Sequence, residues 1–149
     1  MANKSDILLQ MIQEQWAQAR QSEEQRAAMT NYILIIAGAM TGFLVNKSLD
    51  RTALPLTIFL ILLGVFGVVM SAKYRERFYF HIHRIHVMTA RLDELNPEIN
   101  TLQLYKTADR EHHARFPRLE PFPTYALWVA LHISITITGV ATSVIAIIK

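Results

Sequence analysis

The sequence predicts an all-α fold: a three-helix transmembrane protein with an N-terminal amphipathic helix and a helical cytoplasmic segment, assembled as an oligomer. Two observations predict the membrane helices. Apolar residues make up 52% of the 149 residues and charged residues only 18%, whereas about a quarter of a soluble domain is charged. The apolar residues also gather in three charge-free blocks, at 27–46, 53–72 and 122–148. Each block has the roughly 20 residues that a helix needs to cross the hydrocarbon core.

Residues 1–26 precede the first block and are predicted to form a separate cytoplasmic helix. Leu9, Ile12, Trp16 and Ala19 share one face of it, and polar residues occupy the others. A cleaved signal peptide is not expected, because a long polar segment precedes the block and no small-residue cleavage site follows it. The alternative to three membrane helices is a soluble bundle, whose helices would carry a polar stripe facing water. Block 53–72 is apolar all round, which favours the membrane.

The charge distribution predicts the orientation. The segment NKSLDRT between the first two blocks allows only a tight turn, so these blocks are expected to form a hairpin. This turn contains the basic residues Lys47 and Arg51, whereas residues 73–118 contain nine lysines and arginines. Since basic residues favour the cytoplasmic side, the N-terminus and residues 73–121 are predicted to be cytoplasmic.

The cytoplasmic segment 73–121 is predicted to contain two helices. A long helix at 73–95 continues the second membrane helix without a stop signal, and Asn96-Pro97 ends it. Its apolar seam alternates between spacings of four and three, as in a coiled coil, at Tyr74, Phe78, His81, Ile85, Met88, Leu92 and Leu95. The seam predicts packing against another helix, of the same chain or of a copy. A short helix at 100–116 follows, with Asn100 or Thr101 as its cap.

Arg77, Arg84 and Arg91 lie seven residues apart beside this seam. One interpretation is that they pair with glutamates of a neighbouring helix, such as Glu14 or Glu23. The other is an anion-binding stripe, because guanidinium groups bind phosphates bidentately.

The sequence gives no sign of catalysis or of a bound cofactor. It has no cysteine, no glycine-rich phosphate loop, no GxSxG motif and no HExxH motif. Five histidines lie between 81 and 113, but without carboxylates at ligand spacing they do not predict a metal site. We therefore predict that the protein is not an enzyme and holds no metal or cofactor.

The third block divides into three helical faces. One is aliphatic and suits lipid, and one carries His132, Thr136, Gly139 and Ser143. The remaining face carries Ser134, Thr138 and Thr142 and is the predicted pore lining, because hydroxyls can line a water-filled path. The residues predicted to permit close helix packing are Gly38, Gly42, Gly64, Gly67 and Gly139. Three helices enclose no channel, so a homo-oligomer of about four subunits is expected from symmetry.

The arrangement of a polar helix, a tight hairpin, the aromatic-basic stretch YRERFYFHIHRIH and RFPRL followed by LWVALHISITITG resembles SLATT-type small bacterial membrane effectors of anti-phage signalling systems. The membrane partner of the Hailong system is one of these proteins. The resemblance implies a multi-pass protein of the bacterial inner membrane. It also implies that a nucleotide or oligonucleotide from a partner synthase opens an oligomeric pore and depolarises the cell. Many such proteins have only two membrane helices.

Three other classes remain open on the sequence alone. A scaffold that recruits a soluble partner through the long helix would use the same seam. A holin-like pore former also has three short membrane helices, although holins seldom devote about half of the chain to soluble helices. A membrane haem or quinone protein would need paired histidines inside the blocks, and only His132 lies there.

Overall fold

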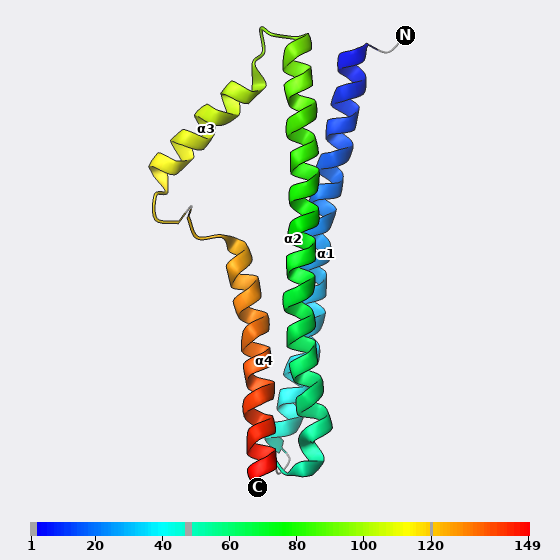
Figure 1. Ribbon diagram of the computed structural model, residues 1–149, viewed down its shortest axis with the longest axis vertical. Coiled ribbons are helices and arrows are strands. Elements are labelled where there is room, and N and C mark those ends of the chain that lie inside the picture. Colours follow the sequence, from blue (N-terminus) through cyan, green and yellow to red (C-terminus); the bar gives the residue numbers. More distant parts are fainter. Residues whose placement is uncertain (1–2, 47–48, 120) are drawn as a thin grey trace. The chain divides into compact units, whose positions relative to one another are not determined.

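A computed structural model describes residues 3–46, 49–119 and 121–149. These residues form only helices, and the all-α prediction is confirmed. The α-helices are α1 (Lys4–Asn46), α2 (Leu54–Leu95), α3 (Thr101–Arg115) and α4 (Thr124–Ile148), and a short 3-10 helix, η1 (Arg51–Ala53), precedes α2 (Figure 1). Three of them, α1, α2 together with η1, and α4, contain stretches long and apolar enough to cross a membrane. Lys47 of the predicted turn lies outside the described residues.

The first helix is longer than predicted. Residues 1–26 and 27–46 were expected to form two elements, but α1 runs without interruption from Lys4 to Asn46. The physical reason is local, since the junction around Arg26 contains neither proline nor glycine and a change in polarity alone does not end a helix. In α2, the membrane block and the long cytoplasmic helix are also one element.

The chain divides into two compact units. Unit 1 comprises residues 1–23 and 75–123, and unit 2 comprises residues 24–74 and 124–149. Thus α1 and α2 each contribute to both units, whereas α3 belongs to unit 1 and α4 to unit 2.

In unit 1, the N-terminal part of α1 packs against the part of α2 that begins at residue 75. The predicted seam faces this contact, with His81 and Ile85 buried and Phe78, Met88 and Leu92 half-buried. Its partner lies within the chain, because Gln15 and Ser5 of α1 form hydrogen bonds to His81 (2.8 Å) and Asn96 (3.2 Å).

The face of α1 that is buried in unit 1 differs from the face that carries its apolar residues. Leu9 is 44% exposed and Trp16 is 39% exposed, whereas Ala19 and Ser22 are buried. The polar residues Ser5 and Gln15 are half-buried instead, because α2 offers them hydrogen-bond partners. The buried face therefore overlaps the apolar face at Ile12 and Ala19 but is turned toward Gln15 and Ser22.

The cap of α3 also differs from the expectation. Asn100 occupies the N-cap position with a left-handed backbone (φ 49°), but its side chain makes no capping bond. Instead, the carboxylate of Asp93 on α2 accepts from the Thr101 N–H (2.8 Å) and the Leu102 N–H (2.9 Å). These hydrogen bonds hold the pKa of Asp93 below its ordinary value, and the bond from the Leu102 N–H has the largest effect.

In unit 2, segments of α1, α2 and α4 lie side by side (Figure 1). Their buried apolar core has members from all three helices, with residues from α1 (Ile33, Ala37, Met40), α2 (Leu60) and α4 (Ile135). The buried positions of α1 continue at spacings of three and four through Thr30, Ile33, Ala37, Met40 and Leu44. This periodicity is typical of left-handed helix packing. Near the far end of the hairpin, α4 also contacts η1.

Candidate functional site

A buried polar contact joins α1 and α4 in unit 2. His132 of α4 and Thr30 of α1 are both 0% exposed, and His132 Nε2 lies 3.3 Å from Thr30 Oγ1. Which of the two atoms donates depends on the histidine tautomer. His132 is the ionisable residue that the sequence placed inside a membrane block, and such residues usually face protein rather than lipid. Here it is enclosed by protein.

Glycines of α2 make room for α4 at this level. A Cβ atom added to Gly67 would lie 2.3 Å from His132 Nδ1. One added to Gly64 would lie 2.7 Å from the Thr136 backbone nitrogen and 2.8 Å from the His132 carbonyl oxygen. Real side chains do not approach so closely, so only glycine permits this distance between the two helices.

Farther along the same contact, Gly139 of α4 performs the reciprocal role against α2. Its added Cβ would lie 2.8 Å from the Ile61 backbone nitrogen and 3.0 Å from the Thr57 carbonyl oxygen. The Ser143 hydroxyl lies 2.7 Å from that of Thr57 and 2.8 Å from the Gly139 carbonyl oxygen. The His132–Gly139–Ser143 face of α4 is therefore its packing face.

Several buried polar atoms near His132 have no hydrogen-bond partner among the described residues. They include Ser71 Oγ, Trp128 Nε1 and His132 Nδ1. Arg26 is 7% exposed, and its guanidinium carbon lies 5.6 Å from the centre of the Trp128 ring. A buried polar group without a partner is costly inside a membrane protein, so these atoms suit bound water, which typically makes about three hydrogen bonds.

The predicted pore-lining residues lie on a different face of α4. Ser134 is exposed, and Thr138 and Thr142 are half-buried. Their hydroxyls form a column along the helix: Ser134 donates to the Leu131 carbonyl (2.7 Å), Thr138 to that of Ser134 (2.9 Å) and Thr142 to that of Thr138 (2.8 Å). Each hydroxyl proton is therefore used within α4, and what remains outward is oxygen lone pairs.

Gly38 and Gly42 of α1 do not take part in these intramolecular contacts. An added Cβ would meet nothing within 4 Å at either position. Together with the exposed residues Asn31 and Ile35, they lie on a face of α1 that the other described residues leave uncovered. Close packing at these glycines would require a second molecule.

The three arginines of the predicted anion-binding stripe are exposed in unit 1. Arg91 forms an ion pair with Glu94 of its own helix, and Arg84 stacks on Phe80 with its guanidinium carbon 4.0 Å from the ring centre. Glu14, one of the acidic partners considered for these arginines, accepts a hydrogen bond from Gln18 of its own helix.

A groove of about 430 Å³ lies beside Arg84. It is lined by Met11 and Gln15 of α1 and by His83, Arg84, Val87 and Met88 of α2. Burial, together with the charges of Arg77 and Arg84, lowers the pKa of the neighbouring His81. The lining of the groove combines the apolar side chains of Met11, Val87 and Met88 with the positive charge of Arg84.

Sequence reasoning did not identify Thr30, Thr57 or Ser71 as contact residues. A signal was present, because each falls in register with buried residues of its own helix at spacings of three and four. As for metals, no group of three or more His, Asp or Glu side chains in the described part of the chain could hold an ion.

Comparisons with known proteins leave the family open. No protein-family model, curated protein or solved structure matches the chain. The resemblance to SLATT-type effectors therefore stays a prediction, and the chain's function is argued from its own residues.

Proposed function

We propose that the chain is one subunit of a homo-oligomeric, ion-conducting membrane pore. The observation that supports the proposal is the hydroxyl column of Ser134, Thr138 and Thr142, which lies outside the His132–Gly139–Ser143 packing face of an apolar helix. Lipid gives no favourable partner to a row of oxygens. A row of oxygens around an axis, in contrast, solvates ions in transit.

The bonding of the column favours cations. Because each hydroxyl donates to a backbone carbonyl of α4, the outward lone pairs can only accept hydrogen bonds or coordinate positive charge. Oxygen acceptors replace the hydration shell of a cation, whereas an anion needs donors. The pore is accordingly expected to prefer potassium and sodium ions to chloride.

A pore requires several copies, since one chain supplies a single hydroxyl column. The uncovered Gly38–Gly42 face of α1 supports contact between copies, because glycines four apart permit two membrane helices to approach closely. We expect a ring of about four subunits. Gly38→Leu should reduce the size of the detergent-solubilised particle, and Val140→Leu on the exposed aliphatic face of α4 is the control.

Unit 1 would then act as the cytoplasmic sensor in a bacterial inner membrane. The groove beside Arg84 suits an anionic ligand with an apolar part, as in a nucleotide or oligonucleotide signal during phage defence. This orientation follows the excess of basic residues between 73 and 118. The stripe of Arg77, Arg84 and Arg91 would supply the phosphate contacts.

Ion flux into liposomes tests the pore. Purified protein should carry potassium, and Thr138→Val should lower the flux several-fold, because valine keeps the shape of threonine but removes its oxygen. Ile137→Val, on the adjacent aliphatic face, is the control and should leave the flux unchanged. Equal flux in both variants would contradict the assignment of the pore face. A well-folded monomer with no flux would favour the scaffold function.

Binding of short single-stranded DNA tests the sensor. Loss of one phosphate contact in Arg84→Gln should reduce the slope of log affinity against log salt by about 0.7. Arg84→Lys keeps the charge and should retain that slope while weakening binding, because lysine cannot bind bidentately. A slope equal to wild type in Arg84→Gln would exclude Arg84 from the site.

A further inference from the structure

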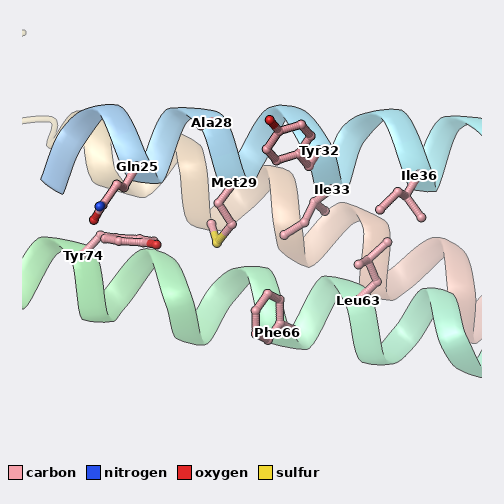
Figure 2. A pocket seen from close by; sticks show the side chains of 9 residues that line it. All are labelled: Gln25, Ala28, Met29, Tyr32, Ile33, Ile36, Leu63, Phe66 and Tyr74. Atoms are coloured by element: carbon pink, nitrogen blue, oxygen red, sulfur yellow. The ribbon is translucent and has the colours of Figure 1, made fainter. Parts of the chain in front are cut away.

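A groove opens on the membrane face of the α1–α2 hairpin in unit 2. Its volume is about 500 Å³. Figure 2 shows Gln25 and Tyr74 at one end and Ile36 and Leu63 at the other. Met29 and Phe66 project into the space between the helices, and the Tyr74 ring lies along the floor. The groove is therefore polar at one end and apolar along the rest of its length.

The length of the groove matches one leaflet. From Gln25 to Ile36 the helix rises about 16 Å at 1.5 Å per residue, and half of the hydrocarbon core is about 15 Å thick. On α1, Gln25 lies just before the charge-free block 27–46 and Ile36 lies at its middle. On α2, Tyr74 lies just past the block 53–72 and Leu63 lies at its middle. The groove thus runs from the membrane boundary to the midplane on both helices.

The deep part of the groove faces away from the contact surfaces already described. On the α1 helical wheel, at 100° per residue, the lining residues Met29 and Ile36 lie about 120–180° from Gly38 and Gly42, whereas Ala28, which also lines the groove, lies about 40–80° from them. The packing face of α4 is occupied by Gly64 and Gly67 of α2. A membrane-crossing helix of a second copy would require a groove through both leaflets, and this groove ends at Ile36 and Leu63.

We propose that this groove binds one acyl chain of a diacyl phospholipid, with the ester group of the lipid at Gln25 and Tyr74. The Tyr74 hydroxyl and the Gln25 amide can donate hydrogen bonds to ester carbonyl oxygens. The aliphatic and aromatic residues deeper in the groove bury the chain. The phospholipid comes from the leaflet on the side of unit 1, which is the cytoplasmic leaflet in the proposed orientation. The inference does not depend on pore formation.

Native mass spectrometry of the full-length protein purified from membranes tests the site. The wild type should retain one phospholipid per chain. Ala28→Phe places a ring in the groove and should abolish this retention, whereas Val140→Phe adds a ring to an exposed position on the aliphatic face of α4 and should not. Tyr74→Phe should weaken retention about three- to tenfold, as expected for one lost hydrogen bond.

Three outcomes would overturn the proposal. One is equal lipid retention by Ala28→Phe and the wild type. Another is an Ala28→Phe particle with fewer subunits but an unchanged number of lipids per chain, which would assign the groove to a second copy. The third comes from photolabelling of the unaltered protein in phosphatidylethanolamine–phosphatidylglycerol vesicles containing a diazirine-bearing acyl chain. Labels should concentrate on Met29, Ile36 and Phe66, and equal labelling of Ile137 on α4 would refute a specific site.

Discussion

Adding a single methyl group to different glycines should separate the packed glycines from the uncovered ones. Gly64 of α2 faces the backbone of α4, with the Thr136 nitrogen and the His132 carbonyl oxygen inside 3 Å of an added Cβ. Gly38 of α1 has nothing within 4 Å of its own added Cβ. Both glycines lie inside long helices, so Gly64→Ala and Gly38→Ala change helix propensity equally and differ only in what the methyl group meets.

The expected free-energy difference follows from this pair. In both helices, alanine gains about 0.5–1 kcal/mol over glycine, because glycine loses more backbone entropy on folding. Within a single chain this gain stands alone at Gly38, so Gly38→Ala should raise the free energy of unfolding of the monomer. At Gly64 the helices must move apart, and overpacking typically costs about 1–3 kcal/mol. Gly64→Ala should therefore be less stable than Gly38→Ala by about 1–3 kcal/mol.

Gly67 provides an internal test of the same reasoning. The three atoms nearest to its added Cβ all belong to the His132 ring, at 2.3–2.7 Å. Removing that ring in His132→Ala should relieve the strain in Gly67→Ala, and the double mutant should show a coupling energy of at least about 0.5 kcal/mol. His132→Ala should not rescue Gly64→Ala, because the Thr136 backbone nitrogen and the His132 carbonyl oxygen still lie within 3 Å of the added methyl group.

Unfolding in mixed micelles by titration with sodium dodecyl sulfate measures these free energies. Trp128 lies one turn before His132 and reports on α4. The other tryptophan is Trp16, and Trp16→Phe leaves Trp128 as the sole fluorescent probe. Equal stability of Gly64→Ala and Gly38→Ala would refute the close contact between α2 and α4, and rescue of Gly64→Ala by His132→Ala would refute its assignment to the backbone.

Further tests address unit 1 and the orientation. Burial and two neighbouring arginines lower the pKa of His81, so the unfolded chain takes up its proton first and unit 1 should lose stability as the pH falls below about 6.5. His81→Gln should remove part of that pH dependence in thermal unfolding, and His83→Gln at an exposed position should not. Asp93 has a lowered pKa, so its cap should be intact above about pH 4 and be lost on acidification; Asp93→Ala should speed hydrogen exchange at the start of α3. In intact cells, an impermeant thiol reagent should label Thr52→Cys and leave Ala108→Cys unlabelled, and the reverse result would invert the topology.

Hydrophobic periodicity predicted much of the fold because it reports burial directly. The charge-free blocks correspond to apolar stretches of α1, α2 and α4, and the seam through His81 and Ile85 is buried as its spacing indicates. The boundary predicted at residue 26 is one of composition, and α1 continues through it, because a change in polarity changes which residues suit a helix but does not interrupt its hydrogen bonds. Where a continuous helix crosses a membrane surface, composition is the signal that the local sequence carries.

Non-local polar contacts could not be read from the sequence. Asp93 caps α3 from the preceding helix, whereas local rules favour Asn100, the residue at the N-cap itself. Thr30 meets His132 from 102 positions away in the chain. Periodicity gives the face on which each residue lies, but the level at which two helices place their polar residues opposite one another depends on their relative register. That register is set by packing.

The faces of α4 and α1 indicate which of the proposals depend on one another. In α4, the packing face and the aliphatic face are explained by one chain in lipid, and the hydroxyl column, which bonds to its own helix, has its proposed role only in a pore. In α1, the groove from Gln25 to Ile36 can be filled by lipid, but Gly38 and Gly42 gain nothing from lipid, which cannot use the close backbone approach that they permit. In the proposed pore, the hydroxyl column and the Gly38–Gly42 face both meet a second copy. The pore and the assembly therefore depend on each other, whereas the lipid site would persist in a monomer, so lipid retention measured on monomeric Gly38→Leu separates the two ideas.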